Sequence, residues 1–228
     1  MEILRHPSPN FTARRGGARP DLIVLHYTAM PSAEAARDRL CDPAAEVSAH
    51  YLIARDGRCL QLVDEEMRAW HAGAGYWQGS RDVNSRSIGI ELDNDGVSPF
   101  SEVQMSVLET LLAGLMERWG IAAEGVIAHS DSAPGRKTDP GPRFDWRRLA
   151  QQGLATWPDR LPQRDGAVDP AAFAVAAHSA GYDPELAPET ILAALRLRFR
   201  PWAWGPLDAE DMALAEALAG IDRGAVRA

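Results

Sequence analysis

Two histidines and one aspartate in this sequence are of the residue types that hold a catalytic metal ion. His26 follows the apolar run 22–25, His129 follows the apolar run 125–128, and Asp139 comes ten residues after His129. Two imidazoles and a carboxylate would leave the fourth position of a tetrahedral zinc ion open for water. A histidine near a strand end is more often a hydrogen-bonded structural residue, however, and Asp-Pro-Gly at 139–141 is typical of a turn. Spacing alone therefore leaves a metal site and a structural role both open.

Two further charged residues have the chemistry that would complete such a site. Glu91 lies in the run SIGIEL at 87–92, where strand alternation places Ile88 and Ile90 on one face and Gly89 and Glu91 on the other. Glu91 is then either a strand-edge residue facing solvent or a general base whose pKa is raised by apolar surroundings. Lys137 lies two residues before the aspartate, where it is either an exposed charge or a group that stabilises an oxyanion.

The elements that must position these residues alternate between strands and helices. Runs rich in β-branched residues predict strands, and the turn signal Asp56-Gly57 predicts a hairpin between the segments on its two sides. Good helix formers predict a helix from Ser32 to Leu40. The expected strands are 22–25, 50–54, 59–63, 87–92 and 125–128.

The clearest helix signal begins at Ser101. This serine and Gln104 form a capping-box pattern, leucines then recur at three- and four-residue steps as far as Trp119, and Gly120 ends the run. The helix is expected to cover one face of the sheet. Alternating strands and helices predict an α/β fold, a central mixed β-sheet flanked by helices, with functional groups collected at strand ends and in loops.

The sequence changes character after Trp157. Prolines and the polar stretch 163–166 are typical of a linker, and no strand-like run follows. We therefore expect two domains, residues 1–160 and residues 165–228, of which the second is a small three-helix unit. Its helices are expected at about 170–180, 188–199 and 209–219.

Composition limits the class of protein. The chain has 228 residues, of which 46% are hydrophobic and 25% are charged, as in ordinary globular domains. A formal net charge of −8 gives no long-range attraction for nucleic acid or for an anionic membrane surface, so neither is expected as a partner. Cys41 and Cys59 are not in a Cys-x-x-Cys pair, and we expect two reduced thiols.

The predicted location is the cytoplasm. No window approaches about 20 uninterrupted apolar residues, and the N-terminal sequence lacks the apolar core of an export signal. A signal removed before residue 1 would instead place the protein in the periplasm.

Six linked motifs in this sequence resemble one known family. They are Ser8–Phe11, Ile23–Thr28, Val47–Ile53, Ala69–Gly73, Asn84–Asn94 and His129–Gly141. Together they span about residues 8–157 and resemble the zinc-dependent N-acetylmuramoyl-L-alanine amidases of the Amidase_2 type, which share their fold with peptidoglycan recognition proteins. Several motifs in the same order make the resemblance specific.

The resemblance implies a role for each candidate residue. It implies that Zn²⁺ is held by His26, His129 and Asp139, that the catalytic carboxylate is Glu91, and that the oxyanion-stabilising lysine is Lys137. Four more positions near the family's cleft become candidates for substrate contact, each of which is equally open to a packing role. These are Tyr27, Trp70, His71 and Asn94.

The implied reaction is hydrolysis of the amide between N-acetylmuramic acid and the L-alanine of a stem peptide. A cytoplasmic enzyme would meet 1,6-anhydro-muropeptides in peptidoglycan recycling, whereas an exported one would act on the cell wall. A non-catalytic muropeptide sensor and a zinc hydrolase of another amide are the competing hypotheses. The expected partners are muropeptides or peptidoglycan fragments, and the oligomeric state stays open.

The C-terminal unit resembles, more loosely, the helical peptidoglycan-binding domains that follow some of these amidases. The likeness rests on residues 180–182, 197–201 and 205–208. The unit is expected either to hold glycan or stem peptide near the site or to stabilise the catalytic domain without binding a ligand.

Overall fold

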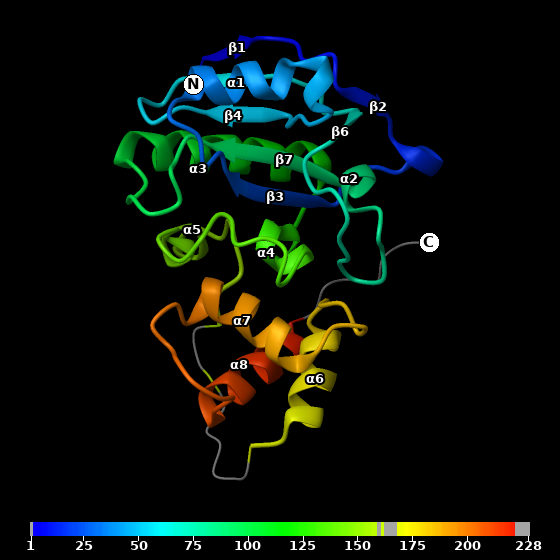
Figure 1. The fold of residues 1–228 in the computed structure, drawn as a ribbon, viewed down its shortest axis with the longest axis vertical. Helices are drawn as coiled ribbons and strands as arrows, with labels where there is room; N and C mark the ends of the chain where they lie inside the picture. The colour runs from blue at the N-terminus through cyan, green and yellow to red at the C-terminus, as the bar shows by residue number, and fades with distance from the viewer. Residues whose placement is uncertain (1, 159–160, 162–167, 222–228) are drawn as a thin grey trace.

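The computed structural model describes residues 2–158, 161 and 168–221, and its centre is a six-stranded mixed β-sheet (Figure 1). The strand order is β1-β5-β4-β7-β3-β8, with β4 and β5 antiparallel and the other neighbours parallel. A separate antiparallel pair joins β2 to β6. The strands are β1 (Ile3–Arg5), β2 (Phe11–Ala13), β3 (Leu22–Tyr27), β4 (Tyr51–Ile53), β5 (Cys59–Gln61), β6 (Met67–Ala69), β7 (Ser87–Leu92) and β8 (Val126–Ala128).

Helices lie on both sides of this sheet, and three more form a unit below it in the view of Figure 1. The helices are α1 (Ala33–Cys41), α2 (Val83–Arg86), α3 (Glu102–Trp119), α4 (His129–Ser132), α5 (Trp146–Gln151), α6 (Pro170–Ser179), α7 (Pro188–Phe199) and α8 (Ala209–Ala219). Among the described residues, none of them is both long and apolar enough to cross a membrane.

Helix α3 packs on one face of the sheet. Ser101 caps its start by accepting a hydrogen bond from the Gln104 amide, and Gly120 ends it in the left-handed conformation at φ 68°. The Gln104 side chain does not complete the capping box, because it donates instead to the carbonyls of Ile53 and Asp93. Strand residues at alternate positions, such as Ile88 and Ile90, form one buried cluster with the leucines of the helix.

The opposite face of the sheet is covered by two separate apolar clusters. Helix α1 contributes Ala36 and Leu40 to a cluster with Leu52 of β4. The C-terminal helices bury Leu22 and other side chains of β3 and β8 in a second cluster. The carboxyl end of β3 lies between these two covered regions, which leaves room there for a polar site.

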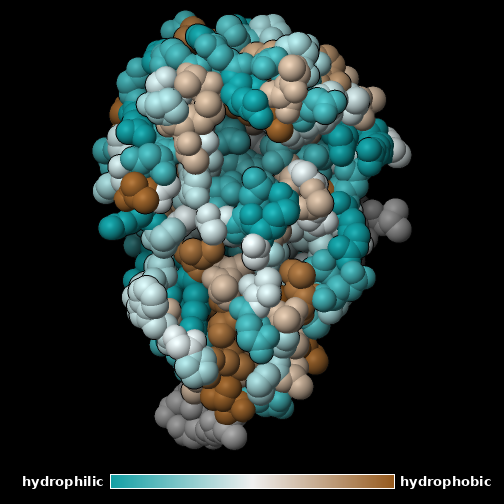
Figure 2. All heavy atoms as spheres, in the orientation of Figure 1, coloured by the Kyte–Doolittle hydropathy of each residue, from teal (hydrophilic) through white to brown (hydrophobic). Residues whose placement is uncertain are grey.

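The C-terminal helices are joined to the sheet by buried polar contacts as well as by apolar packing. Arg198 of α7 donates to Asp131 of α4 at 2.7 Å, and both side chains are buried. The Tyr182 hydroxyl donates to the same carboxylate at 2.9 Å. Figure 2 shows hydrophobic residues gathered over the C-terminal helices, whereas the surface over the sheet and α1 is mostly hydrophilic.

Most of the predicted elements are confirmed. Strand 87–92 and helices 188–199 and 209–219 have the predicted bounds, and the hairpin around Asp56-Gly57 is β4–β5. The strand predicted at 22–25 continues to Tyr27, so that His26 lies within β3 rather than after it. Strands β1, β2 and β6 and the helices α2, α4 and α5 were not predicted, because these short elements lack the apolar run or the helical periodicity that marks the predicted ones.

The predicted fold class, a central mixed sheet flanked by helices and followed by three helices, is confirmed. Cys41 and Cys59 are both free. The division into domains at 160 and 165 stays a prediction, because most of that junction is outside the described residues. The second apolar cluster shows that the two parts of the chain share a core.

Candidate active site

The pairing of two parallel strands positions the first two site residues. β3 and β7 run side by side with His26 opposite Glu91. Because side chains alternate along a strand, both point to the face away from α3, as do Ser87 and Gly89. The prediction that Glu91 lies on the face opposite Ile88 is therefore confirmed.

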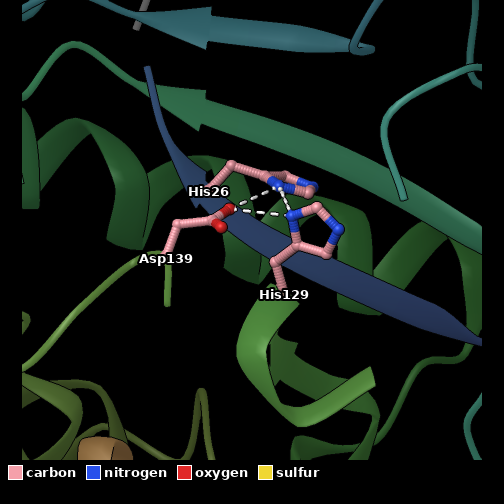
Figure 3. A group of neighbouring side chains, drawn as sticks. All are labelled: His26, His129 and Asp139. Atoms are coloured by element: carbon pink, nitrogen blue, oxygen red, sulfur yellow. Dashed lines mark hydrogen bonds and ion pairs between the residues drawn. The ribbon is translucent and has the colours of Figure 1, made fainter. Parts of the chain in front are cut away.

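Three buried side chains converge beside this strand pair (Figure 3). His26 comes from β3, His129 begins α4, and Asp139 comes from the loop that follows it. The Nδ1 atoms of the two histidines are 3.0 Å apart, and each is 2.9 Å from Oδ2 of Asp139. The structure thus brings together the three residues predicted as metal ligands.

The electrostatics of this cluster favour a bound cation. Burial and the neighbouring His129 lower the pKa of His26 to about 4, so its imidazole is neutral at pH 7. Burial raises the pKa of Asp139, but contacts with His129 and His26 outweigh that effect and hold it below its ordinary value. A neutral imidazole and an ionised carboxylate are the forms that bind a metal ion.

The hydrogen bonding of His129 fits the same interpretation. Its Nε2 lies 3.0 Å from the carbonyl oxygen of Ala72, which can only accept, so Nε2 carries the proton. The Nδ1 lone pair then points at Asp139 and His26. When Nδ1 of His26 is also unprotonated, two nitrogen lone pairs and a carboxylate oxygen lie within about 3 Å of one another, and a cation between them would stabilise that arrangement. The residues present therefore fit a metal ion such as Zn²⁺, for which two histidines and one carboxylate form a known ligand set.

Glu91 lies beside the cluster in the same pocket. Burial, followed by the charge of Asp139, raises its pKa well above the ordinary value, while the charge of Lys137 opposes that shift. Its Oε2 atom is buried and has no hydrogen-bond partner among the described residues. A carboxylate that is destabilised in this way has a strong tendency to take up a proton, which is the property of a general base.

A pocket of about 400 Å³ opens over the cluster. It is lined by the three converging residues together with Glu91 and Lys137, so all five predicted catalytic and metal-ligating residues meet in one cavity. Two arginines, Arg39 and Arg136, also line it. The pocket can therefore hold a small ligand against the cluster, with basic side chains in part of its wall.

The four candidates for substrate contact differ in where they lie. Tyr27 and Trp70 line the pocket, and the Tyr27 hydroxyl is 2.8 Å from Oγ1 of Thr138. His71 also lines it, but both of its ring nitrogens contact protein atoms. Asn94 lies outside the pocket lining, where its side chain shapes a loop by accepting from the Gly96 amide at 2.7 Å.

Some residues of the site were not predicted from the sequence. Arg136 donates to the carbonyl oxygens of Ala72 and Ala74 and so fixes the segment that His129 contacts. Ser87 lies behind the site in contact with His71. Strand alternation could have identified Ser87. This residue lies two positions before Gly89 and four before Glu91, and therefore on the same face of β7.

Residues 16–142 match the sequence profile of a family described as N-acetylmuramoyl-L-alanine amidase, Amidase_2. Those residues contain the sheet core, the three converging side chains and Glu91 with Lys137.

Curated proteins similar to this chain are amidases. The N-acetylmuramoyl-L-alanine amidase AmiD of Escherichia coli K12 is 38% identical in an alignment of 232 positions that covers 88% of this chain and 82% of AmiD. The 1,6-anhydro-N-acetylmuramyl-L-alanine amidase AmpD of Enterobacter cloacae is 38% identical over 163 residues, which cover 64% of this chain and 87% of AmpD.

A solved structure extends the likeness to the whole fold. The complex of AmiD from E. coli with the substrate anhydro-N-acetylmuramic acid-L-Ala-D-gamma-Glu-L-Lys aligns with a TM-score of 0.79 at 37% identity, covering 91% of each chain. An alignment that covers 91% of this chain must include residues of the C-terminal helices.

Proposed function

This chain belongs to the N-acetylmuramoyl-L-alanine amidase family, and we propose that it hydrolyses the amide between N-acetylmuramic acid and the L-alanine of a stem peptide with the help of Zn²⁺. The chain is an amidase of that family, with relatives of the same class over most of its length. The metal, the role of each residue and the form of the substrate are the parts that we propose. The observation that carries the proposal is the convergence of the five predicted residues in one pocket.

His26, His129 and Asp139 are the proposed zinc ligands. Their donor atoms meet within about 3 Å, and the proton of His129 is held on the nitrogen that faces away from the cluster. When bound, zinc would polarise the scissile carbonyl and lower the pKa of a water molecule toward ~7.

Glu91 and Lys137 are the proposed catalytic side chains. Glu91 accepts a proton from the attacking water, whose oxygen forms a bond to the carbonyl carbon. The carbon–nitrogen bond then breaks, and Glu91 passes the proton to the departing amine of L-alanine. The Lys137 ammonium stabilises the negative charge that develops on the carbonyl oxygen.

The proposed substrate is a soluble 1,6-anhydro-muropeptide from peptidoglycan recycling. The curated relative AmpD carries that substrate in its name, and AmiD was solved with an anhydro-muropeptide. The pocket supports the proposal because Arg39, Arg136 and Lys137 suit a ligand that carries peptide carboxylates. The cytoplasmic location that would fit this substrate stays a prediction.

The test compares purified anhydro-muropeptide with insoluble peptidoglycan, each with and without a zinc chelator, and detects products by mass spectrometry. We expect chelator-sensitive release of free stem peptide from the soluble fragment. Release from intact peptidoglycan instead would assign the chain to the cell wall, and binding without release from either substrate would support a sensor. Glu91→Gln is the matched control, because it keeps the side-chain volume and removes the base.

A further inference from the structure

We propose that His71, held by Ser87, is a positioning residue that fixes His26 in the form able to bind the metal. This inference rests on the proposed function, since it takes His26 as a metal ligand. A neutral imidazole has one N–H, and a ligand nitrogen must be the one without the proton. His26 must therefore carry its proton on Nε2 if Nδ1 is to bind.

A chain of hydrogen bonds behind His26 determines which of its ring nitrogens carries the proton. The Ser87 hydroxyl donates its one proton to the carbonyl oxygen of Val83 at 2.7 Å. Its oxygen can then only accept from His71, whose Nε2 lies 3.1 Å away, so His71 carries its proton on Nε2. The Nδ1 atom of His71 is left with a lone pair, and it lies 3.0 Å from Nε2 of His26. Nε2 of His26 must be the donor, which leaves Nδ1 of His26 free for the metal.

The His71 ring is closely packed against strand β7. A Cβ atom on Gly89 would come within 2.4 Å of His71, so the ring lies directly over a strand position that has no side chain. The Asn84 side chain accepts hydrogen bonds from the amides of His71 and Ala72 at 3.1 and 2.8 Å. The same short segment therefore contacts both ligand histidines, through the His71 ring and through the Ala72 carbonyl.

These contacts assign His71 a positioning role and not a role in binding substrate. Both of its ring nitrogens have partners within the protein, although the residue lies at the pocket. Loss of the ring would leave Nε2 of His26 without an acceptor and let the proton shift to Nδ1. Hydrogen-bond partners of this kind typically contribute 10- to 100-fold in metal affinity.

The first experiment measures tautomers by NMR in full-length protein labelled with ¹⁵N-histidine, with and without zinc. We expect His71 to carry its proton on Nε2 in both samples, because Ser87 sets it. In the zinc-loaded sample we expect a coupling across the hydrogen bond between Nε2 of His26 and Nδ1 of His71. A proton on Nδ1 of His71 would overturn the inference whether or not the protein binds zinc.

The second experiment measures zinc affinity by competition with a chromophoric chelator. We expect His71→Leu to weaken zinc binding about 10- to 100-fold. His71→Asn should recover part of that loss, because its Oδ1 can take the place of Nδ1 as an acceptor. Affinity of His71→Leu within about twofold of the parent protein would overturn the inference.

Two serine variants keep the test decisive if His71→Leu fails to fold. Ser87→Ala removes the group that orients the His71 ring, and we expect mixed His71 tautomers with about 10-fold weaker zinc binding. Ser8→Ala is the matched control, since Ser8 is also buried, donates to the Leu40 carbonyl and accepts from the Asn10 amide. Equal effects of the two variants on zinc affinity would show a merely structural role. A parent protein that binds no zinc would refute the proposed function, while the His71 tautomer would still decide this inference.

Discussion

His26 and Glu91 occupy paired positions on the neighbouring parallel strands β3 and β7. The register places a proposed metal ligand and the proposed base on one face of the sheet, at the same height along the two strands. Both strands lie inside the sheet with a neighbour on each side, so their pairing fixes the spacing of these two backbone positions. A change in that spacing would break the strand pairing.

Replacement of this base separates catalysis from metal binding. We expect Glu91→Gln to lower kcat by about 100- to 10,000-fold, because the amide cannot take up the proton of the attacking water as the proposed base does. Zinc content should stay at one ion per chain, since Glu91 is outside the ligand cluster. Metal analysis with turnover of an anhydro-muropeptide checks both values. Activity within tenfold of the parent would refute the role of Glu91.

Replacement of the carboxylate ligand should remove metal and activity together. Asp139→Ala leaves two imidazoles without the charge that holds the cation, so we expect loss of stoichiometric zinc after dialysis. Elemental analysis of the dialysed protein measures this directly. A variant that retained one zinc per chain would disprove the ligand set.

Lys137 should affect the transition state more than the metal. We expect Lys137→Met to reduce kcat by about 100- to 1000-fold with a small change in KM, as for the loss of one oxyanion donor. Zinc affinity from chelator competition should stay close to that of the parent. Equal losses in zinc affinity and in kcat would instead assign Lys137 to the support of the metal site.

A half-buried glutamate away from the site, Glu65, should make stability depend on pH. Burial raises the pKa of Glu65, but hydrogen bonds from Arg118, Tyr51 and Trp119 outweigh it, so the folded-state pKa is lower than in the unfolded chain. Its contribution is therefore present above the unfolded-state pKa of about 4.3 and is lost as pH falls through the folded-state value.

The corresponding variant is Glu65→Gln. We expect it to lower the free energy of unfolding by about 1.5–3 kcal/mol at pH 7, with a smaller difference at pH 3. Urea denaturation at the two pH values measures the change. Glu117→Gln, at an exposed position of α3, is the control and should have little effect at either pH. A difference that did not shrink in acid would contradict the assignment.

The C-terminal helices should contribute to the stability of the sheet. We expect Arg198→Met to lower the free energy of unfolding by about 3–5 kcal/mol, because it removes the ion-pair partner of the buried Asp131 carboxylate. Arg58→Met breaks exposed ion pairs with Glu34 and Asp56 and should have little effect on stability. Urea unfolding followed by tryptophan fluorescence compares the two variants. Equal losses would show that the contact between α7 and α4 is not part of the core.

Local sequence signals predicted most of the elements that carry the site. Helix α3 is capped by Ser101 and Gly120 as predicted, β7 has the predicted bounds, and Glu91 lies on the predicted face. These features depend on residues a few positions apart, so a short stretch of sequence contains their causes. The family motifs then identified which polar residues belong together.

The tertiary structure decided how those residues meet. His26 lies 103 residues from His129 and 113 from Asp139, and no periodicity relates positions so far apart. Two contacts could be found only in the folded structure, namely that of Ser87 with His71 and that of Arg198 with Asp131. Each ring nitrogen of a neutral imidazole donates or accepts a hydrogen bond, and the neighbouring groups decide which of the two nitrogens carries the proton. The sequence therefore determined which groups the protein has, and the packing of distant segments determined where their protons and charges are held.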